Sequence, residues 1–127
     1  MSKLTLIRGL PGSGKSTMAR KTAVDTGALH VEADMWVDYS QPYTPEAARR
    51  AHVICQSQAR HALVFGESVV VSNTFTRQWE VQPYLDMARQ YGAQVEIITA
   101  IGDYGSIHNV PAEAIQAMRE RWEEVTA

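Results

Sequence analysis

The sequence has little of what stabilises secreted proteins or anchors proteins in membranes. Cys55 is the only cysteine, so no disulfide can form within the chain. No apolar run approaches the ~20 residues that a membrane-spanning helix needs, and we expect no membrane association. No secretory signal stands at the N-terminus, and with a single cysteine this favours a reducing, cytoplasmic location.

Basic side chains are also few. Lysine and arginine total 12 against 14 acidic residues, and a net charge of −2 disfavours indiscriminate nucleic-acid binding, which depends on many phosphate contacts from basic side chains. No internal repeat, low-complexity tract or block of like charge divides the chain. With 127 residues, 45% of them hydrophobic, we expect residues 1–127 to form a single domain with a real core.

Short apolar segments alternate with helix-compatible ones along the chain. Strands are expected at 4–8, 29–32, 69–71 and 95–101, and helices at 15–25, 45–65, 80–91 and 111–125. Thr44-Pro45 is a helix start signal, with threonine as N-cap and proline at the first helical position. Three consecutive valines at 69–71 are typical of a central parallel strand covered on both faces. The alternation predicts an α/β fold, with a small and mostly parallel sheet flanked by helices.

One glycine-rich segment carries the strongest chemical signal. It reads Gly9-Leu10-Pro11-Gly12-Ser13-Gly14-Lys15-Ser16-Thr17, which matches G-x-x-x-x-G-K-[ST] between the first strand and the first helix. Glycines let the backbone bring several N–H groups onto one anion, and the helix N-terminus adds its dipole. Lys15 would reach the β- and γ-phosphates, and the Ser16 hydroxyl would ligate Mg²⁺. We therefore predict a nucleoside triphosphate site formed by Gly9, Pro11, Gly12, Ser13, Gly14, Lys15, Ser16 and Thr17.

Further polar residues follow the other expected strands. Ligands of parallel sheets collect beyond the carboxyl ends of the strands, so Asp34 and Ser72-Asn73-Thr74 should lie beside the glycine-rich loop. Asp34 could accept the proton of an attacking hydroxyl, hold Mg²⁺, or simply cap a short helix that begins at Met35. The neutral Ser72-Asn73-Thr74 stands where many such proteins have a metal-binding aspartate. It could orient a substrate phosphate, or only close a turn. Arg77 is the arginine best placed to hold an acceptor phosphate.

The chain resembles the P-loop kinase-like family that includes the 5′-kinase domain of phage polynucleotide kinase and many small bacterial and phage relatives. The shared segments, in family order, are the glycine-rich loop and residues 32–36, 70–76, 79–80, 83–84, 107–111 and 118–123. This resemblance implies a three-layer P-loop NTPase fold with ATP as the phosphate donor. It also implies that Asp34 is the general base and that Asn73 and Thr74 contact the acceptor side.

Two departures from the family pattern keep three functions open. Val37 stands where polynucleotide kinases have an arginine, and Gly105-Ser106 stands where relatives carry Arg-Asn in a lid over the triphosphate. The first function is a Mg²⁺-dependent kinase in which Lys15 and Asp34 are catalytic and Arg8, Arg77 or a partner subunit replaces the lid arginine. Its acceptor would be the hydroxyl of a polynucleotide 5′ end, a nucleoside or a small molecule.

The other two functions need no acceptor. One is a nucleotide-binding module with little transfer activity, and the other is a slow NTPase used as a switch. Because no Asn-Lys-x-Asp segment occurs to read guanine, a GTPase is disfavoured.

Overall fold

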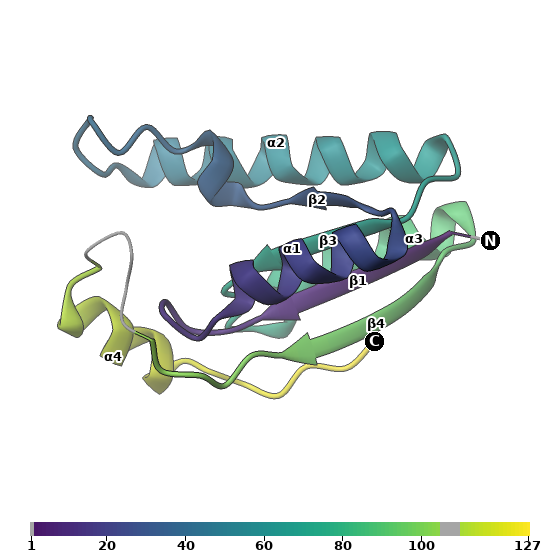
Figure 1. The fold of residues 1–127 in the computed structure, drawn as a ribbon. Helices are drawn as coiled ribbons and strands as arrows, with labels where there is room; N and C mark the ends of the chain where they lie inside the picture. Colours follow the sequence, from purple (N-terminus) through teal and green to yellow (C-terminus); the bar gives the residue numbers. More distant parts are fainter. Residues whose placement is uncertain (1, 105–109) are drawn as a thin grey trace.

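The computed structural model describes residues 2–104 and 110–127. In chain order the elements are β1 (Lys3–Arg8), α1 (Lys15–Thr26), β2 (Leu29–Val31), the short 3-10 helix η1 (Ala33–Trp36), α2 (Pro45–Val64), β3 (Val69–Asn73), α3 (Gln78–Tyr91), β4 (Gln94–Thr99) and α4 (Ala112–Glu120) (Figure 1). The four strands pair in parallel in the order β2-β3-β1-β4. The predicted α/β fold with a parallel sheet flanked by helices is confirmed.

Helices cover both faces of this sheet. The larger apolar cluster joins Leu6 of β1 and Val71 of β3 to side chains of α2 and α3, among them Ala59 and Leu85. On the opposite face, Ala19 of α1 packs in a second apolar cluster with Ile7 of β1 and Val70 of β3. All five residues of β3 are buried, as expected for a central parallel strand with both faces covered.

Local signals set the start of the longest helix. The Thr44 hydroxyl oxygen accepts a hydrogen bond from the Ala47 N–H at 3.0 Å, and Pro45 lies in the first turn of α2. The predicted start signal is therefore confirmed. None of the helices in the described ranges is long and apolar enough to span a membrane.

Two elements end at least two residues earlier than predicted. The sequence predicts a last helix over 111–125, but α4 ends at Glu120 because the following chain bonds elsewhere, with the Glu123 N–H donating to the Thr76 carbonyl at 2.9 Å. The strand predicted to reach residue 101 ends at Thr99, because the Gly102 N–H bonds to the Ser13 carbonyl in the glycine-rich loop. In both places tertiary hydrogen bonds override local propensity.

Candidate functional site

The glycine-rich loop connects the carboxyl end of β1 to the first turn of α1 (Figure 1). Gly12 and Gly14 adopt φ angles of 82° and 89°, which lie in the left-handed region that favours glycine. Lys15 is the first residue of α1, so the unpaired N–H groups and positive dipole end of that helix lie at the loop. The predicted phosphate-binding segment thus has the strand–loop–helix setting that it requires.

Residues after β4 form hydrogen bonds with β1 and with this loop. The Ala100 N–H donates to the Arg8 carbonyl at 2.7 Å, and the Tyr104 N–H donates to the Gly12 carbonyl at 2.7 Å. The Tyr104 ring lies against Gly14, because a Cβ built on that glycine would stand 3.0 Å from the ring. The loop is therefore held in its conformation by contacts within the protein.

A pocket of about 410 Å³ opens beside the loop. Its walls are Leu10, Pro11 and Ser13 of the loop, residues 99–103, and Arg119 and Trp122 near the end of α4. Within the described residues, the buried Ser13 hydroxyl has no hydrogen-bond partner, as expected of a polar group that a ligand or water satisfies. Mostly apolar walls with a few polar groups are typical of small-molecule sites.

Sequence reasoning missed Glu32, which directly follows β2. This residue is 8% exposed, and its Oε1 accepts a hydrogen bond from the Ser72 hydroxyl at 2.5 Å and lies 2.9 Å from His30 Nε2. Burial alone would raise the pKa of this carboxyl. Hydrogen bonds from His30, Ser72 and Ser16, together with the charge of His30, instead lower the pKa to about 2. An ionised carboxylate therefore bonds the Ser16 hydroxyl that the sequence predicts as a metal ligand.

Two acidic residues of the segment after β2 lie near Lys15. Burial lowers the pKa of its ammonium group, while the negative charges of Asp34 and Glu32 act in the opposite direction. Asp34 is an exposed residue of η1 whose Oδ1 accepts a hydrogen bond from the Tyr39 hydroxyl at 2.9 Å. The alternative that Asp34 caps a helix from Met35 is wrong, because η1 begins at Ala33 and has Glu32 at its N-cap position.

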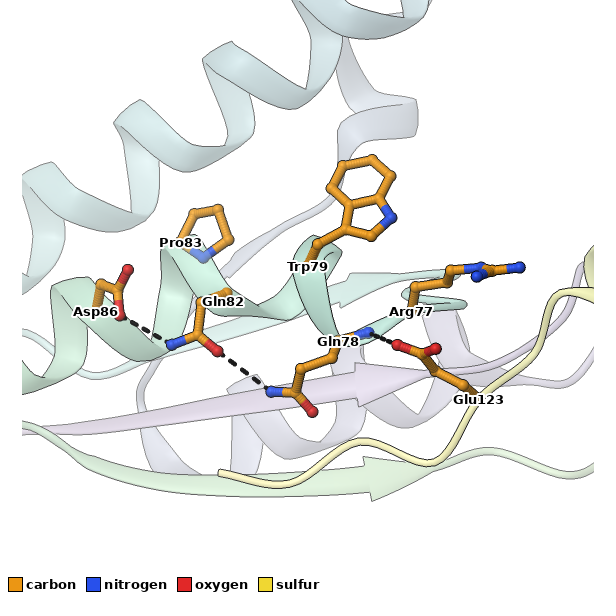
Figure 2. Close-up of a pocket in the computed structure, with 7 residues that line it drawn as sticks. All are labelled: Arg77, Gln78, Trp79, Gln82, Pro83, Asp86 and Glu123. Carbon is orange, nitrogen blue, oxygen red and sulfur yellow. Dashed lines mark hydrogen bonds between the residues drawn. The ribbon is translucent and has the colours of Figure 1, made fainter.

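Asn73 fixes the position of η1. Its side chain is buried, its Oδ1 accepts from the Ala33 N–H at 2.9 Å, and its Nδ2 donates to the Cys55 sulfur at 3.7 Å. The β3–α3 loop (residues 74–77) follows, with Thr74 half-buried and Arg77 exposed at the N-cap of α3. Figure 2 shows the Arg77 side chain extending away from α3 in the direction in which β1 and β4 run.

Arg8 does not replace the lid arginine. Its side chain is 2% exposed, and its guanidinium donates to the carbonyls of Phe75 and Glu123, both at 2.9 Å. These donors are therefore engaged by the protein. The lid position at 105–106 and residues 107–109 of the family-like segment lie outside the described residues.

The side-chain oxygen atoms near the loop are suitable ligands for Mg²⁺. This ion prefers oxygen ligands and uses one or two carboxylates together with substrate phosphates. Ser16 offers a hydroxyl that already bonds Glu32, and Asp34 offers a second carboxylate. Across 2–104 and 110–127, no group of three or more His, Cys, Asp and Glu side chains forms a closed metal site. A metal held here would thus need the phosphates of a nucleotide as additional ligands.

The amino-acid sequence is similar to a known protein family and to a curated protein. The model of the AAA domain family matches residues 4–104. Human NEDD4-binding protein 2 is 29% identical over 96 residues, which are 72% of this chain and 5% of that protein. The chain therefore corresponds to a small part of this curated relative.

Two solved structures share the fold at low identity. Kti12 of Chaetomium thermophilum, in complex with ADP-AlF3, superposes with a TM-score of 0.70 at 15% identity, covering 95% of this chain and 80% of that one. A gluconokinase from Sinorhizobium meliloti 1021 gives a TM-score of 0.63 at 17% identity, covering 96% and 75%. Because the family model spans the chain from β1 to the segment after β4, the protein belongs to the AAA domain family.

Proposed function

We propose that this protein binds ATP with Mg²⁺ and transfers the γ-phosphate to a hydroxyl of an acceptor. One observation carries the proposal: Lys15 begins α1 directly after the left-handed Gly12 and Gly14. The negative charges of Asp34 and Glu32 act on its ammonium group. Phosphoryl transfer depends mainly on positioning and on charge stabilisation. Lys15 would supply charge for the phosphates. The two carboxylates would hold the metal, and that of Asp34 would also accept the acceptor proton.

Each part of the loop has a role in this proposal. The backbone N–H groups of residues 9–17 and the Lys15 ammonium group would hold the triphosphate. Ser16, Glu32 and Asp34 would hold Mg²⁺, which when bound neutralises charge on the β- and γ-phosphates. The pocket beside the loop, lined by Trp122 and Arg119, would take the base.

The acceptor side lies at η1 and the β3–α3 loop. Asp34 would accept the proton of the attacking hydroxyl. Asn73 would act by holding η1, since its amide oxygen bonds the Ala33 N–H. Thr74 and Arg77 would contact the acceptor, and the exposed guanidinium of Arg77 favours an acceptor that carries a phosphate.

The names of the structural neighbours support the kinase proposal. One is called a gluconokinase and another was solved with ADP-AlF3. The acceptor here is the hydroxyl of a polynucleotide 5′ end, a nucleoside or a small molecule. A cytoplasmic location fits the use of ATP and the single, reduced cysteine.

Two observations favour a second candidate, a nucleotide-binding module or slow NTPase switch with little transfer. Arg8 is engaged by backbone carbonyls, and no lysine or arginine stands between Arg89 and Arg119. An arginine that stabilises the transferring phosphate contributes roughly 10³- to 10⁵-fold in rate in related NTPases. Without one, the same site would bind a nucleotide and turn it over slowly.

Transfer from γ-labelled ATP to a panel of acceptors separates the candidates. The panel holds 5′-hydroxyl DNA and RNA, nucleosides, and small hydroxyl metabolites, each with Mg²⁺. We expect label on one class of acceptor. Nucleotide binding with no labelled product would instead favour the binding module, and release of labelled inorganic phosphate alone would favour the switch.

A further inference from the structure

Residues 121–126, which we call the C-terminal strap, continue from α4 past the first turn of α3 (Figure 1). The Gln78 N–H donates to the Glu123 carboxylate at 2.6 Å, an interaction drawn in Figure 2. Further along, the Gln78 side chain donates to the Thr126 carbonyl and accepts from the Thr126 N–H, both at 2.9 Å. The strap is thus bound at two points to the start of α3.

Thr76, in the β3–α3 loop, is the point where the strap meets that loop. It is fully buried. Its carbonyl accepts from the Glu123 N–H at 2.9 Å, and its hydroxyl lies 3.3 Å from Nε of Arg121. The same hydroxyl donates to the Glu80 carboxylate. Backbone and side chain of one loop residue therefore both contact the strap.

Arg8 also contacts both segments, the C-terminal strap and the β3–α3 loop. Its guanidinium donates to the Phe75 carbonyl at 2.9 Å and to the Thr76 carbonyl at 3.4 Å in the loop. It also donates to the Glu123 carbonyl of the strap at 2.9 Å. The Trp122 ring covers the cation, with the guanidinium carbon 3.8 Å from the ring centroid. One buried cation therefore holds carbonyls from two distant parts of the chain.

The loop needs such support because Phe75 is strained. It is 2% exposed and has a φ of 47°, the left-handed region that a bulky side chain disfavours. Such conformations persist where the surroundings determine them, and they cluster at ligand sites. Here the Arg8 bond holds the Phe75 carbonyl, and an edge-on contact with Tyr84, at 5.5 Å between ring centroids, holds its side chain.

We propose that Arg8 is a positioning residue that couples the C-terminal strap to the β3–α3 loop. Docking of the strap, secured by Trp122 over the guanidinium, then sets the geometry of the loop that carries Thr74 and Arg77. That this loop faces the acceptor rests on the proposed function. The coupling itself rests only on the hydrogen bonds and on the cation–ring contact.

Amide hydrogen exchange of the full chain, resolved by NMR, tests the coupling without any ligand. Trp122→Ala should speed exchange in residues 74–77 and 121–126 together, by about 3- to 30-fold, from the loss of a partly desolvated cation–π contact. Trp122→Phe keeps a ring over Arg8 and should restore most of the protection. Gln90→Ala, an exposed substitution late in α3, should leave both segments unchanged.

The β1 amides serve as the internal reference for an intact fold. If Trp122→Ala does not fold, Gln78→Ala loosens the strap from its other end and gives the same comparison. Faster exchange in the strap with wild-type exchange in residues 74–77 would overturn the proposal. Joint loosening of both segments is the result we expect.

A second readout separates this inference from the proposed function. Gln78→Ala should raise the acceptor KM by a larger factor than the nucleotide dissociation constant, because Gln78 itself lies outside the pocket beside the glycine-rich loop, whereas Trp122 of the strap lines that pocket. Equal losses for nucleotide and acceptor would indicate general loosening and would overturn the positioning role. If wild-type protein neither binds nucleotide nor transfers phosphate, the proposed function fails, while the exchange comparison still decides the coupling.

Discussion

The Ser72 hydroxyl donates a 2.5 Å hydrogen bond to the Glu32 carboxylate, from β3 to the residue that follows the neighbouring strand β2. Many P-loop proteins carry their metal-binding aspartate on the strand that here holds Ser72. In this chain a carboxylate, that of Glu32, follows the next strand of the sheet and bonds Ser16 as well. The neutral end of β3 therefore does not leave the site without an acid.

Glu32→Gln tests this role, because it keeps the shape of the side chain and removes its charge. Nucleotide binding in the presence of Mg²⁺ should weaken by about 10- to 100-fold, the usual cost of losing a group that supports a metal site. Titration calorimetry with EDTA in place of Mg²⁺ should show unchanged binding. Glu67→Gln, at an exposed carboxylate, is the control. Equal weakening with and without the metal would contradict the assignment.

Lys15→Met tests the phosphate contact, because it removes the ammonium group and keeps a long apolar side chain. Nucleotide affinity should fall by about 10- to 150-fold, the equivalent of a charge-assisted hydrogen bond worth about 1.5–3 kcal/mol. The measurement is a titration with a fluorescent ATP analogue. Lys21→Met is the matched control, since Lys21 is an exposed residue of α1 whose ammonium group pairs with Asp25 at 2.8 Å. Retained affinity in Lys15→Met would show that the nucleotide binds elsewhere.

Cys55 should be chemically inert in the folded protein. It is fully buried, and burial raises the pKa of its thiol even though the neighbouring Tyr84 hydroxyl and the hydrogen bond from Asn73 act to lower it. Because the folded state holds this proton more tightly, stability should decline as pH rises above the ~8.5 of an unfolded thiol. Iodoacetamide labelling followed by mass spectrometry should show reaction only as denaturant unfolds the chain. Fast labelling of native protein would refute the prediction.

Thr44→Ala should remove the N-cap of α2. The hydroxyl that accepts from the Ala47 N–H is lost, so the free energy of unfolding should fall by about 1 kcal/mol. Urea denaturation followed by circular dichroism measures the change. Thr44→Ser retains the hydroxyl and should remain close to wild type. A serine variant as unstable as the alanine variant would assign the effect to the lost methyl group instead.

The glycine-rich loop, the α2 cap and the valine strand could be predicted because each depends on a local pattern. The role of Glu32 could not, because it depends on β2 lying beside β3 and on a serine that the other strand supplies. An acid directly after a short strand was the available signal. The early end of α4 was not predictable either. Residues 121–123 are helix-compatible, and contacts with Thr76, Arg8 and Gln78 hold them outside the helix.

The account depends most on Asp34 as the group that accepts the acceptor proton. The most direct test is phosphate transfer by Asp34→Asn, with nucleotide affinity measured on the same sample. Asp38→Asn is the control, because Asp38 is also exposed and its carboxylate bonds Ser40 nearby. We predict that Asp34→Asn loses transfer by about 10²- to 10⁴-fold and still binds ATP, while Asp38→Asn keeps both. Transfer at the wild-type rate in Asp34→Asn would contradict the account.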